Sequence, residues 1–308
     1  MSSSRLKILY IAGESRSGST ILGQILGETP HFFFTGEILN IWRHYLINDR
    51  DCACGLPASQ CEVWSNIFHT AFNMETLNVE QMETWRLNSV RYRFAWKMLL
   101  SIFKPQLKND LKHYLKNIEN LYRAISQTTG AKIIVDSSKR PTYAFLLGLI
   151  PTVDVFIVHL VRDSRGVAYS WKKKKIQQHT IGNPVYMRQF TPLRTAWRWN
   201  ISNLLTELLL QKSSNYLRVR YEDFVHDPTC ELSKIFQLIG LSKNEIPTFK
   251  QKKIWLSANN GVWGNPSRFE NGEIELLWDN EWQSQLPMKT QRVVKMLTWV
   301  GLRRYRYL

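Results

Sequence analysis

Residues 7–20, KILYIAGESRSGST, constrain the fold more than any other stretch of the chain. They open with an apolar run, residues 8–12, whose composition is typical of a buried strand. The polar residues 13–20 follow, and apolar residues at helical spacing resume at Ile21. A strand, a glycine-bounded loop and a helix form a phosphate cradle, because glycines let backbone N–H groups turn inward and the helix N-terminus adds a positive dipole end. The stretch therefore predicts an anion-binding loop at the start of an α/β fold.

The loop departs from the P-loop of nucleotide triphosphatases at one position. Ser19 stands where that pattern has its lysine. In those enzymes the lysine reaches the β- and γ-phosphates and the next hydroxyl holds magnesium. The strong cation here is Arg16, inside the loop. We interpret the loop as a site for an anionic phospho-group other than a magnesium-bound triphosphate; the alternative is a loop that only starts a helix.

The length and charge of the chain limit the classes of protein to consider. An α/β chain of 308 residues, 44% hydrophobic, can form one domain with a sizeable core, and we expect residues 1–308 to do so. A net charge of +16 favours anionic partners: a nucleotide cofactor, an acidic polysaccharide, nucleic acid or an anionic membrane face. No stretch approaches the roughly 20 apolar residues of a transmembrane helix. MSSSR leads directly into the first strand without room for a secretory signal, so we expect a cytoplasmic enzyme.

Strands and helices alternate along much of the chain. We expect further strands at residues 32–35, 132–135, 153–161 and 216–219, and helices at 21–26, 38–47, 142–150, 165–175, 191–211, 229–239 and 289–300. Residues 62–130 form a helical insertion with breaks at Pro105 and at 109–110, and residues 250–308 form a C-terminal loop and tail. Strands separated by helices predict a central parallel sheet in a three-layer sandwich, similar to P-loop nucleotide triphosphatases.

Four polar segments follow the predicted strands, at residues 13–20, 136–140, 162–165 and 220–223. Ligands of parallel sheets bind beyond the carboxyl ends of the strands. All four segments carry charges or hydroxyl groups, so we expect them to converge on one anionic ligand.

Two of these segments resemble the sulfotransferases that use 3′-phosphoadenosine-5′-phosphosulfate (PAPS). SRSGST resembles the family's 5′-phosphosulfate loop, and VHLVRDSRGVAYS, residues 158–170, resembles its 3′-phosphate element. An arginine fork and a hydroxyl, here Arg162 and Ser170, can hold a phosphate dianion by charge-assisted hydrogen bonds. The resemblance implies that these two residues bind the 3′-phosphate. It implies that Ser17, Gly18, Ser19 and Thr20 cradle the 5′-phosphate, and that Arg16 binds the cofactor beside them.

Four further segments extend the resemblance to residue 269. Residues 29–37, with Glu37 at the end, resemble the tyrosylprotein branch, whose glutamate at this place is the catalytic base. DSSK, residues 136–139, resembles that branch's lysine-bearing loop. RYED, residues 220–223, resembles the family's tyrosine-containing segment, and GNPSRF, residues 264–269, resembles a cofactor loop of bacterial relatives. The resemblance implies general-base catalysis by Glu37. It also implies charge stabilisation by Arg16 and Lys139 and cofactor contacts from Tyr221 and Arg268.

The predicted reaction moves the sulfuryl group from PAPS to a hydroxyl or amine of a carbohydrate, lipid or small metabolite, and leaves 3′,5′-bisphosphoadenosine. It needs no metal and no nucleic-acid partner. Each role has a structural alternative: Glu37 could cap the helix that starts near Ile38, Lys139 could be solvated, and Tyr221 could pack in the core. Two other functions remain open: a P-loop kinase with Asp136 on magnesium, or a basic protein that binds nucleic acid or another polyanion.

Three cysteines, Cys52, Cys54 and Cys61, lie within ten residues. They could bind zinc with a fourth ligand such as His44, His69 or Cys230, although a C-x-C spacing without a second pair indicates zinc only weakly. We interpret the segment as a structural thiol loop near the acceptor cleft, with a metal site or a disulfide as the alternatives.

Overall fold

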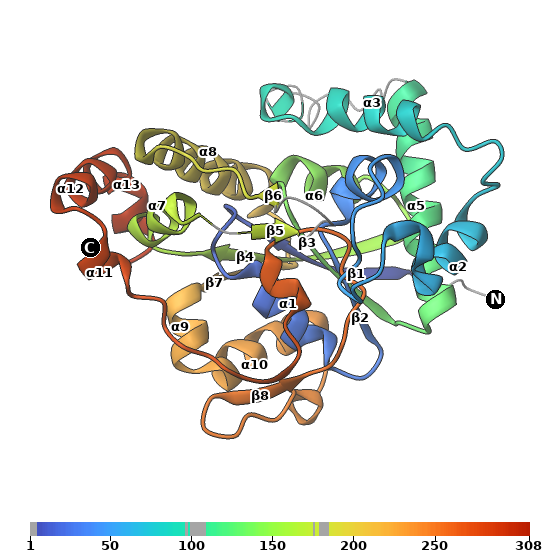
Figure 1. Ribbon diagram of the computed structural model, residues 1–308. Coiled ribbons are helices and arrows are strands. Elements are labelled where there is room, and N and C mark those ends of the chain that lie inside the picture. The colour runs from blue at the N-terminus through green and yellow to red at the C-terminus, as the bar shows by residue number, and fades with distance from the viewer. Residues whose placement is uncertain (1–4, 96–97, 99–108, 175, 179–184) are drawn as a thin grey trace.

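A five-stranded parallel sheet forms the centre of the computed structural model, which describes residues 5–95, 98, 109–174, 176–178 and 185–308 (Figure 1). The strand order is β2-β3-β1-β4-β7, and every neighbouring pair runs parallel. The strands are β1 (Leu6–Ala12), β2 (Phe32–Gly36), β3 (Ile133–Lys139), β4 (Val153–Val161) and β7 (Tyr216–Arg220). The predicted α/β fold with a central parallel sheet is confirmed.

Strand β1 divides the core between two helical layers. Leu6, Ile8, Tyr10 and Ala12 belong to one hydrophobic cluster with α5 (Asn109–Thr129) and α6 (Pro141–Leu147). The alternate residues of β1, Leu9 and Ile11, belong to a second cluster with α1 (Ser19–Gly27) and α10 (Pro228–Ile239). This alternation is the period of two that a strand imposes. Figure 1 shows α6 and α8 above the sheet and α1, α9 and α10 below it.

The predicted helical insertion packs on the sheet. Helices α2 (Glu62–Ala71), α3 (Val79–Val90) and α5 contribute buried side chains to the same cluster as β1. The expected break at residues 109–110 falls where the description of the chain resumes with α5, and Pro105 lies outside the described residues. The predicted helix at residues 38–47 is a 3₁₀ turn, Ile38–Asn40, followed by a π-helix, Ile41–Ile47.

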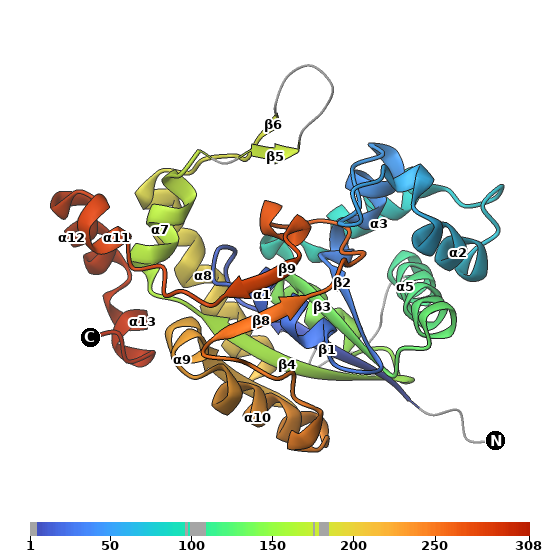
Figure 2. The same cartoon turned by 60° about the horizontal axis from the view of Figure 1, so that its bottom comes forward.

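Several elements differ from the sequence-based expectation. Strand β3 runs through Lys139, so most of the predicted loop at residues 136–140 is strand. Residues 250–275, which lack clear periodicity, contain a hairpin of β8 (Lys253–Leu256) and β9 (Gly272–Glu275) that lies across α1 in Figure 2. The remaining elements include α7 (Ser164–Lys172), α8 (Pro192–Leu210), α9 (Tyr221–His226), α11 (Trp282–Gln285), α12 (Met288–Leu297), α13 (Trp299–Arg304), and a second hairpin of β5 (Ile176–Gln178) and β6 (Val185–Tyr186).

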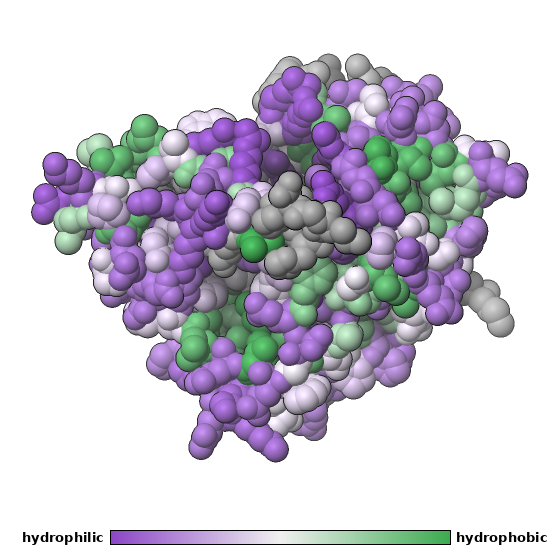
Figure 3. All heavy atoms as spheres, viewed as in Figure 1, coloured by the Kyte–Doolittle hydropathy of each residue, from purple (hydrophilic) through white to green (hydrophobic). Residues whose placement is uncertain are grey.

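Hydrophilic side chains cover most of the face shown in Figure 3, as the net charge of +16 leads one to expect. A hydrophobic patch lies where α12 and α13 meet solvent, and Met296 and Val300 there are 70% and 74% exposed. Within the described residues, the helices are all too short or too polar to cross a bilayer.

Two glycines of the loop after β1 lie so close to neighbouring atoms that no side chain fits there. Gly18, the N-cap of α1, has a φ of 91°, and a Cβ on it would lie 2.5 Å from Cδ2 of Tyr221. Gly13 has a φ of 130°, and its Cβ would lie 2.4 Å from the carbonyl oxygen of Leu160 in β4. Side chains at these positions would meet both backbone strain and a steric clash.

Gly18→Ala should therefore lower the free energy of unfolding by about 2–4 kcal/mol, more than backbone strain alone accounts for. Gly130 supplies the matched control, since its φ is 70° but no atom of the described residues lies within 4 Å of its ideal Cβ position. Gly130→Ala should lower the free energy of unfolding only by the backbone strain of a positive φ, about 1–2 kcal/mol. Urea unfolding followed by circular dichroism measures both. Equal losses in the two variants would contradict a tight contact between Gly18 and Tyr221.

A buried histidine in β4 makes folding sensitive to acid. His159 is fully buried, with Nε2 2.9 Å from Oδ1 of Asn203 and Nδ1 2.6 Å from the hydroxyl of Tyr216. The amide nitrogen of Asn203 donates to the Trp199 carbonyl, so its Oδ1 must accept from Nε2 and Nδ1 must accept from Tyr216. Burial disfavours the charged ring and lowers the pKa of His159 to about 4.

The free energy of unfolding should therefore fall by up to about 3 kcal/mol as the pH drops from 6.5 to 4, because the unfolded chain binds a proton at residue 159 that the folded chain does not. His159→Gln should lack this component, whereas His226→Gln, at an exposed position, should keep it. Urea unfolding at several pH values between 4 and 7 measures the difference in the free energy of unfolding between the wild type and each variant. If the difference in the free energy of unfolding between wild type and His159→Gln stays constant with pH, His159 is not the source of the acid sensitivity.

Candidate active site

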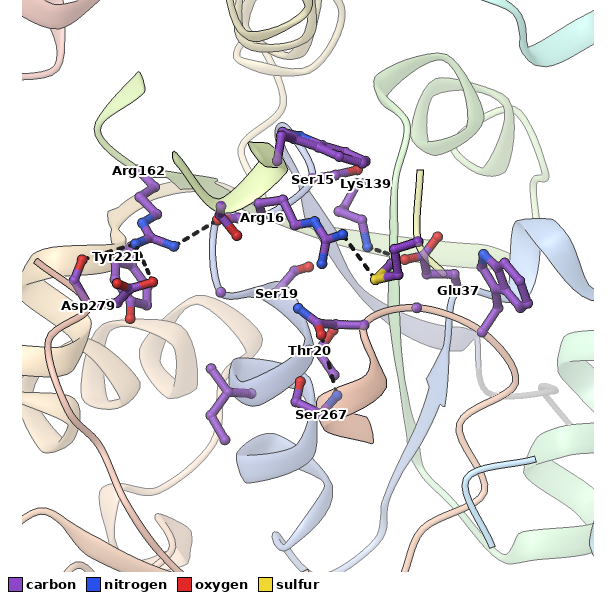
Figure 4. Close-up of a pocket in the computed structure, with 18 residues that line it drawn as sticks. Ser15, Arg16, Ser19, Thr20, Glu37, Lys139, Arg162, Tyr221, Ser267 and Asp279 are labelled. Carbon is purple, nitrogen blue, oxygen red and sulfur yellow. Dashed lines mark hydrogen bonds and ion pairs between the residues drawn. The ribbon is translucent and has the colours of Figure 1, made fainter. Parts of the chain in front are cut away.

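A pocket of about 330 Å³ lies at the carboxyl edge of the sheet, and all five strands contribute to it (Figure 4). Arg16 comes from the loop after β1 and Glu37 directly follows β2. Lys139 is the last residue of β3, while Arg162 follows β4 and Tyr221 follows β7. The structure thus brings together the four segments expected to converge, with Glu37 beside them.

Nine of the eleven sequence-predicted site residues line this pocket: Arg16, Gly18, Ser19, Thr20, Glu37, Lys139, Arg162, Ser170 and Tyr221. Ser17 does not line it; that residue is 2% exposed and its hydroxyl is buried. Arg268 does not line it either. The side chain is 1% exposed, donates through Nη2 to the Asp51 carbonyl at 3.2 Å, and lies against the Phe269 ring.

The first turn of α1 forms the floor of the pocket. Ser19 and Thr20 open the helix, and Gly18 precedes them. The first N–H groups of a helix have no partner within the helix, and the dipole makes this end attractive to anions. The floor can therefore hold a phosphate or sulfate group through backbone donors and two hydroxyls.

Arg16 lies above this floor. Its guanidinium is 4.6 Å from the Trp171 ring centre, and Nη2 is 3.0 Å from Sδ of Met187. Burial lowers the pKa of Arg16 from its usual value. A thioether is only a weak acceptor. Within the described part of the chain Arg16 forms no ion pair, so its donors can bind an anionic ligand.

Lys139 and Glu37 form one end of the pocket. Nζ of Lys139 is 2.6 Å from Oε1 of Glu37 and 2.9 Å from the Ser137 carbonyl. The other carboxylate oxygen of Glu37 accepts from the side-chain amide of Asn40 at 2.9 Å. Glu37 precedes the 3₁₀ turn, yet its side chain makes no capping hydrogen bond. The carboxylate is therefore held in the pocket by Lys139 and Asn40, and the capping alternative is not supported.

Arg162 forms the other end, apart from Lys139 in Figure 4. Its Nη2 is 3.0 Å from both the carbonyl oxygen and Oδ2 of Asp279, and Nη1 donates to the Arg16 carbonyl at 3.1 Å. The guanidinium lies 4.6 Å from the centre of the Tyr221 ring. Ser170 of α7 also lines the pocket. The Arg162 end offers a fork of donors, with Asp279 as its present anionic partner.

Sequence reasoning missed Asp279 and several other lining residues. Asp279 and Met187 lie in segments without periodicity, and no motif marked them. The motif GNPSRF did mark its segment, but Ser267 lines the pocket in place of Arg268. Residues 266–269 form a 3₁₀ helix, which has three residues per turn, so neighbouring side chains point about 120° apart. The other missed lining residues are Ser15, Ile21, Trp171, Trp263, Gly264 and Asn265.

A smaller pocket shares Ser15, Glu37 and Lys139 with the first. Its walls are polar. Arg198 pairs with Glu14 at 3.0 Å, and Arg140 stacks on the Tyr92 ring at 4.4 Å. Glu37 and Lys139 therefore line both polar spaces. The remaining residues that line the smaller pocket are Gly13, Leu39, Asn40, Arg86 and Ser138.

Asp136, the magnesium ligand of the kinase hypothesis, lines neither pocket. It is fully buried and accepts from the Tyr122 hydroxyl at 2.6 Å and from Ser138. Burial raises the pKa of Asp136 to about 6. Its hydrogen bonds anchor the end of β3 to α5, which is a structural role.

Comparisons with known proteins place the chain in a family. The model of the sulfotransferase family matches residues 9–245. No curated protein matches. Among solved structures, the chain is similar to the sulfotransferase domain of the Synechococcus PCC 7002 olefin synthase (16% identity, 96% of each chain covered, TM-score 0.48). It is also similar to the sulfotransferase domain of the curacin biosynthetic pathway (20% identity, 96% of this chain and 99% of that one, TM-score 0.49).

A third similar structure is retinol dehydratase in complex with retinol and PAP (14% identity, 98% of this chain and 82% of that one, TM-score 0.36). With TM-scores below 0.5, these likenesses add no argument of their own. The family match spans well over half of the chain and includes the loop after β1, Glu37, Lys139, Arg162, Ser170 and Tyr221. The chain therefore belongs to the sulfotransferase family.

Proposed function

We propose that this protein transfers the sulfuryl group of PAPS to a hydroxyl or amine of a polar acceptor. The observation that carries the proposal is the distribution of cations: Arg162 at one end of the pocket, Lys139 at the other, and Arg16 between them over the start of α1. PAPS carries a 3′-phosphate and a 5′-phosphosulfate, which need two separate anion sites. A magnesium triphosphate would need a lysine at the place of Ser19 and a free acid, and Asp136 is engaged elsewhere.

The residues divide into those that hold the nucleotide and those that act on the sulfuryl group. We assign the 3′-phosphate to Arg162 and Ser170, and Tyr221 to the floor beneath them. The 5′-phosphate lies on the first turn of α1, at Gly18, Ser19 and Thr20, with the Ser17 backbone next to it. Arg268 acts indirectly, because its contact with the Asp51 carbonyl supports the turn that carries Ser267.

In the proposed reaction the acceptor enters from the smaller pocket and presents its hydroxyl to Glu37. Glu37 takes the hydroxyl proton as the acceptor oxygen forms its bond to sulfur. The bond from sulfur to the bridging phosphate oxygen breaks, and its electron pair stays on that oxygen. Arg16 and Lys139 stabilise the charge that develops on the bridging and sulfuryl oxygens. The products are a sulfated acceptor and 3′,5′-bisphosphoadenosine.

The smaller pocket favours a polar acceptor. Its walls carry Glu14, Arg140 and Arg198 next to Glu37. Charged and hydrogen-bonding walls suit a carbohydrate or a small polar metabolite better than an apolar lipid chain, which would leave these groups without partners.

Glu37→Gln should lower the turnover number by about 10²–10⁴ while binding of bisphosphoadenosine changes little, because the amide cannot accept the proton. Release of bisphosphoadenosine from PAPS, with an acceptor selected from sugars, polar metabolites and lipids, measures turnover, and calorimetry measures binding. Glu62→Gln, at an exposed position of α2, is the matched control. Undiminished turnover in Glu37→Gln would refute the base assignment, and magnesium-dependent ATP binding tighter than bisphosphoadenosine binding would refute the reaction.

Asp279→Asn should tighten the binding of bisphosphoadenosine several-fold, because the Asp279 carboxylate competes with the 3′-phosphate for Arg162. Arg162→Gln should weaken the same binding by about 10–100-fold. Adenosine 5′-phosphate lacks the 3′-phosphate, so neither substitution should change its affinity by more than about two-fold. Calorimetry with the two nucleotides separates these effects. Equal changes for both nucleotides would contradict a 3′-phosphate site at Arg162.

A further inference from the structure

The three clustered cysteines lie outside the active-site pocket and have the spacing of metal ligands. Sγ of Cys61 is 3.6 Å from that of Cys52 and 3.8 Å from that of Cys54, and all three lie within 4.8 Å of one another. Thiolates at about 2.3 Å from a tetrahedral zinc ion lie about 3.8 Å apart. A disulfide would need about 2.05 Å between two sulfurs and would leave the third cysteine unpaired.

One hydrogen-bond donor lies against both buried sulfurs. The side-chain amide of Asn260 lies 3.7 Å from Sγ of Cys52 and 3.6 Å from Sγ of Cys61. Cys61 is also the N-cap of the ten-residue helix α2, whose dipole favours a negative charge there. The amide and the helix end suit thiolates, which are the form of cysteine that binds metals.

A buried cation beside the cluster gives a second, independent observation. Arg268 is 1% exposed, lies within electrostatic reach of Glu37 and, more weakly, of Cys52, and donates to the carbonyl of Asp51, the residue before Cys52. Its Nε and Nη1 have no hydrogen-bond partner in the described part of the chain. A divalent ion with three thiolates carries one net negative charge, which balances the charge of such a guanidinium.

The cluster also fastens a segment of the active site. Residues 259–264 reach the cysteine loop through hydrogen bonds from Ala53 N to the Gly261 carbonyl (3.1 Å) and from Trp64 Nε1 to the Asn260 carbonyl (2.7 Å). The same segment reaches the catalytic end of the pocket, where the Trp263 carbonyl accepts from the backbone N–H of Glu37 (3.1 Å). An ion in the cluster would therefore hold Trp263 against Glu37.

We propose that Cys52, Cys54 and Cys61 bind one zinc ion, with water in the fourth position, and that the ion fixes residues 259–264 beside the active site. Cys54 is exposed, which leaves the fourth position open to solvent. Binding displaces the thiol protons and involves no change of oxidation state. The cluster contains none of the fourth ligands considered from the sequence, His44, His69 and Cys230, as far as the described residues extend. This site does not depend on the proposed sulfuryl transfer.

The test measures the metal content of the full chain, expressed with added zinc and purified without chelator, by inductively coupled plasma mass spectrometry. We expect about one zinc per chain in the wild type and in Cys230→Ser, a variant of the exposed cysteine outside the cluster. Cys52→Ser and Cys61→Ser should lose the ion. Cys54→Ser, which changes an exposed side chain and is least expected to disturb folding, should bind zinc at least ten-fold more weakly.

Two further measurements on the wild type keep the result clear if the buried variants misfold. Titration of the metal-stripped chain with Co²⁺ should produce a thiolate-to-cobalt charge-transfer band that zinc abolishes. Hydrogen exchange of residues 259–264 should be slower with zinc than after chelation. Wild-type protein without zinc and without a cobalt band would overturn the site, as would an intact mass lower by two hydrogens, which marks a disulfide. Zinc binding without an effect on exchange would overturn the link to residues 259–264.

Discussion

The parallel arrangement of the five strands is the constraint on which the rest of the structure depends. Parallel strands all end at the same edge of a sheet, so residues far apart in the sequence become neighbours there. The edge is also irregular. The register of β1 against β3 shifts between Tyr10 and Ala12, and Lys139 at the end of β3 has a φ of 68°. Such irregularities redirect a chain at the end of a sheet, and here they accompany the turn of Lys139 toward Glu37.

The partners of the buried cations are the second feature that organises the site. The carboxylates beside the buried cations are Glu37 for Lys139 and Asp279 for Arg162. Removing a charge from water costs several kcal/mol unless a partner compensates. Arg16 instead has an aromatic ring and a thioether beside it within the described residues. A cation already paired with a carboxylate binds an anionic ligand only after exchanging its partner, so Arg16 is the cation of the three that is ready to bind one.

The sequence predicted the strands correctly where they consist mostly of apolar residues. Strand β4 has both of its predicted ends, since nine mostly apolar residues stand between a proline-containing turn and Arg162. The end of β3 was not foreseen, because DSSK is polar, yet all four residues are buried and Asp136 is satisfied by Tyr122 and Ser138. The strands of hairpin β8–β9 have four residues each; β8 alternates exposed with buried residues and β9 alternates half-buried with exposed ones, a pattern too brief to recognise. Motifs located site segments, but only the three-dimensional turn at residues 266–269 decides that Ser267 faces the pocket and Arg268 does not.

Because Ser19 replaces the P-loop lysine, the cations of the pocket come from other segments of the chain. A lysine at that position would place its charge on the helix, above the phosphates. Here the cations come from elsewhere: Arg16 from the loop, in a left-handed conformation with a φ of 73°, and Lys139 from β3. Both therefore stand on the side of the pocket that faces Glu37, as Figure 4 shows. Positive charge next to a carboxylate suits the proposed reaction, in which a proton leaves the acceptor while negative charge grows on the leaving oxygen.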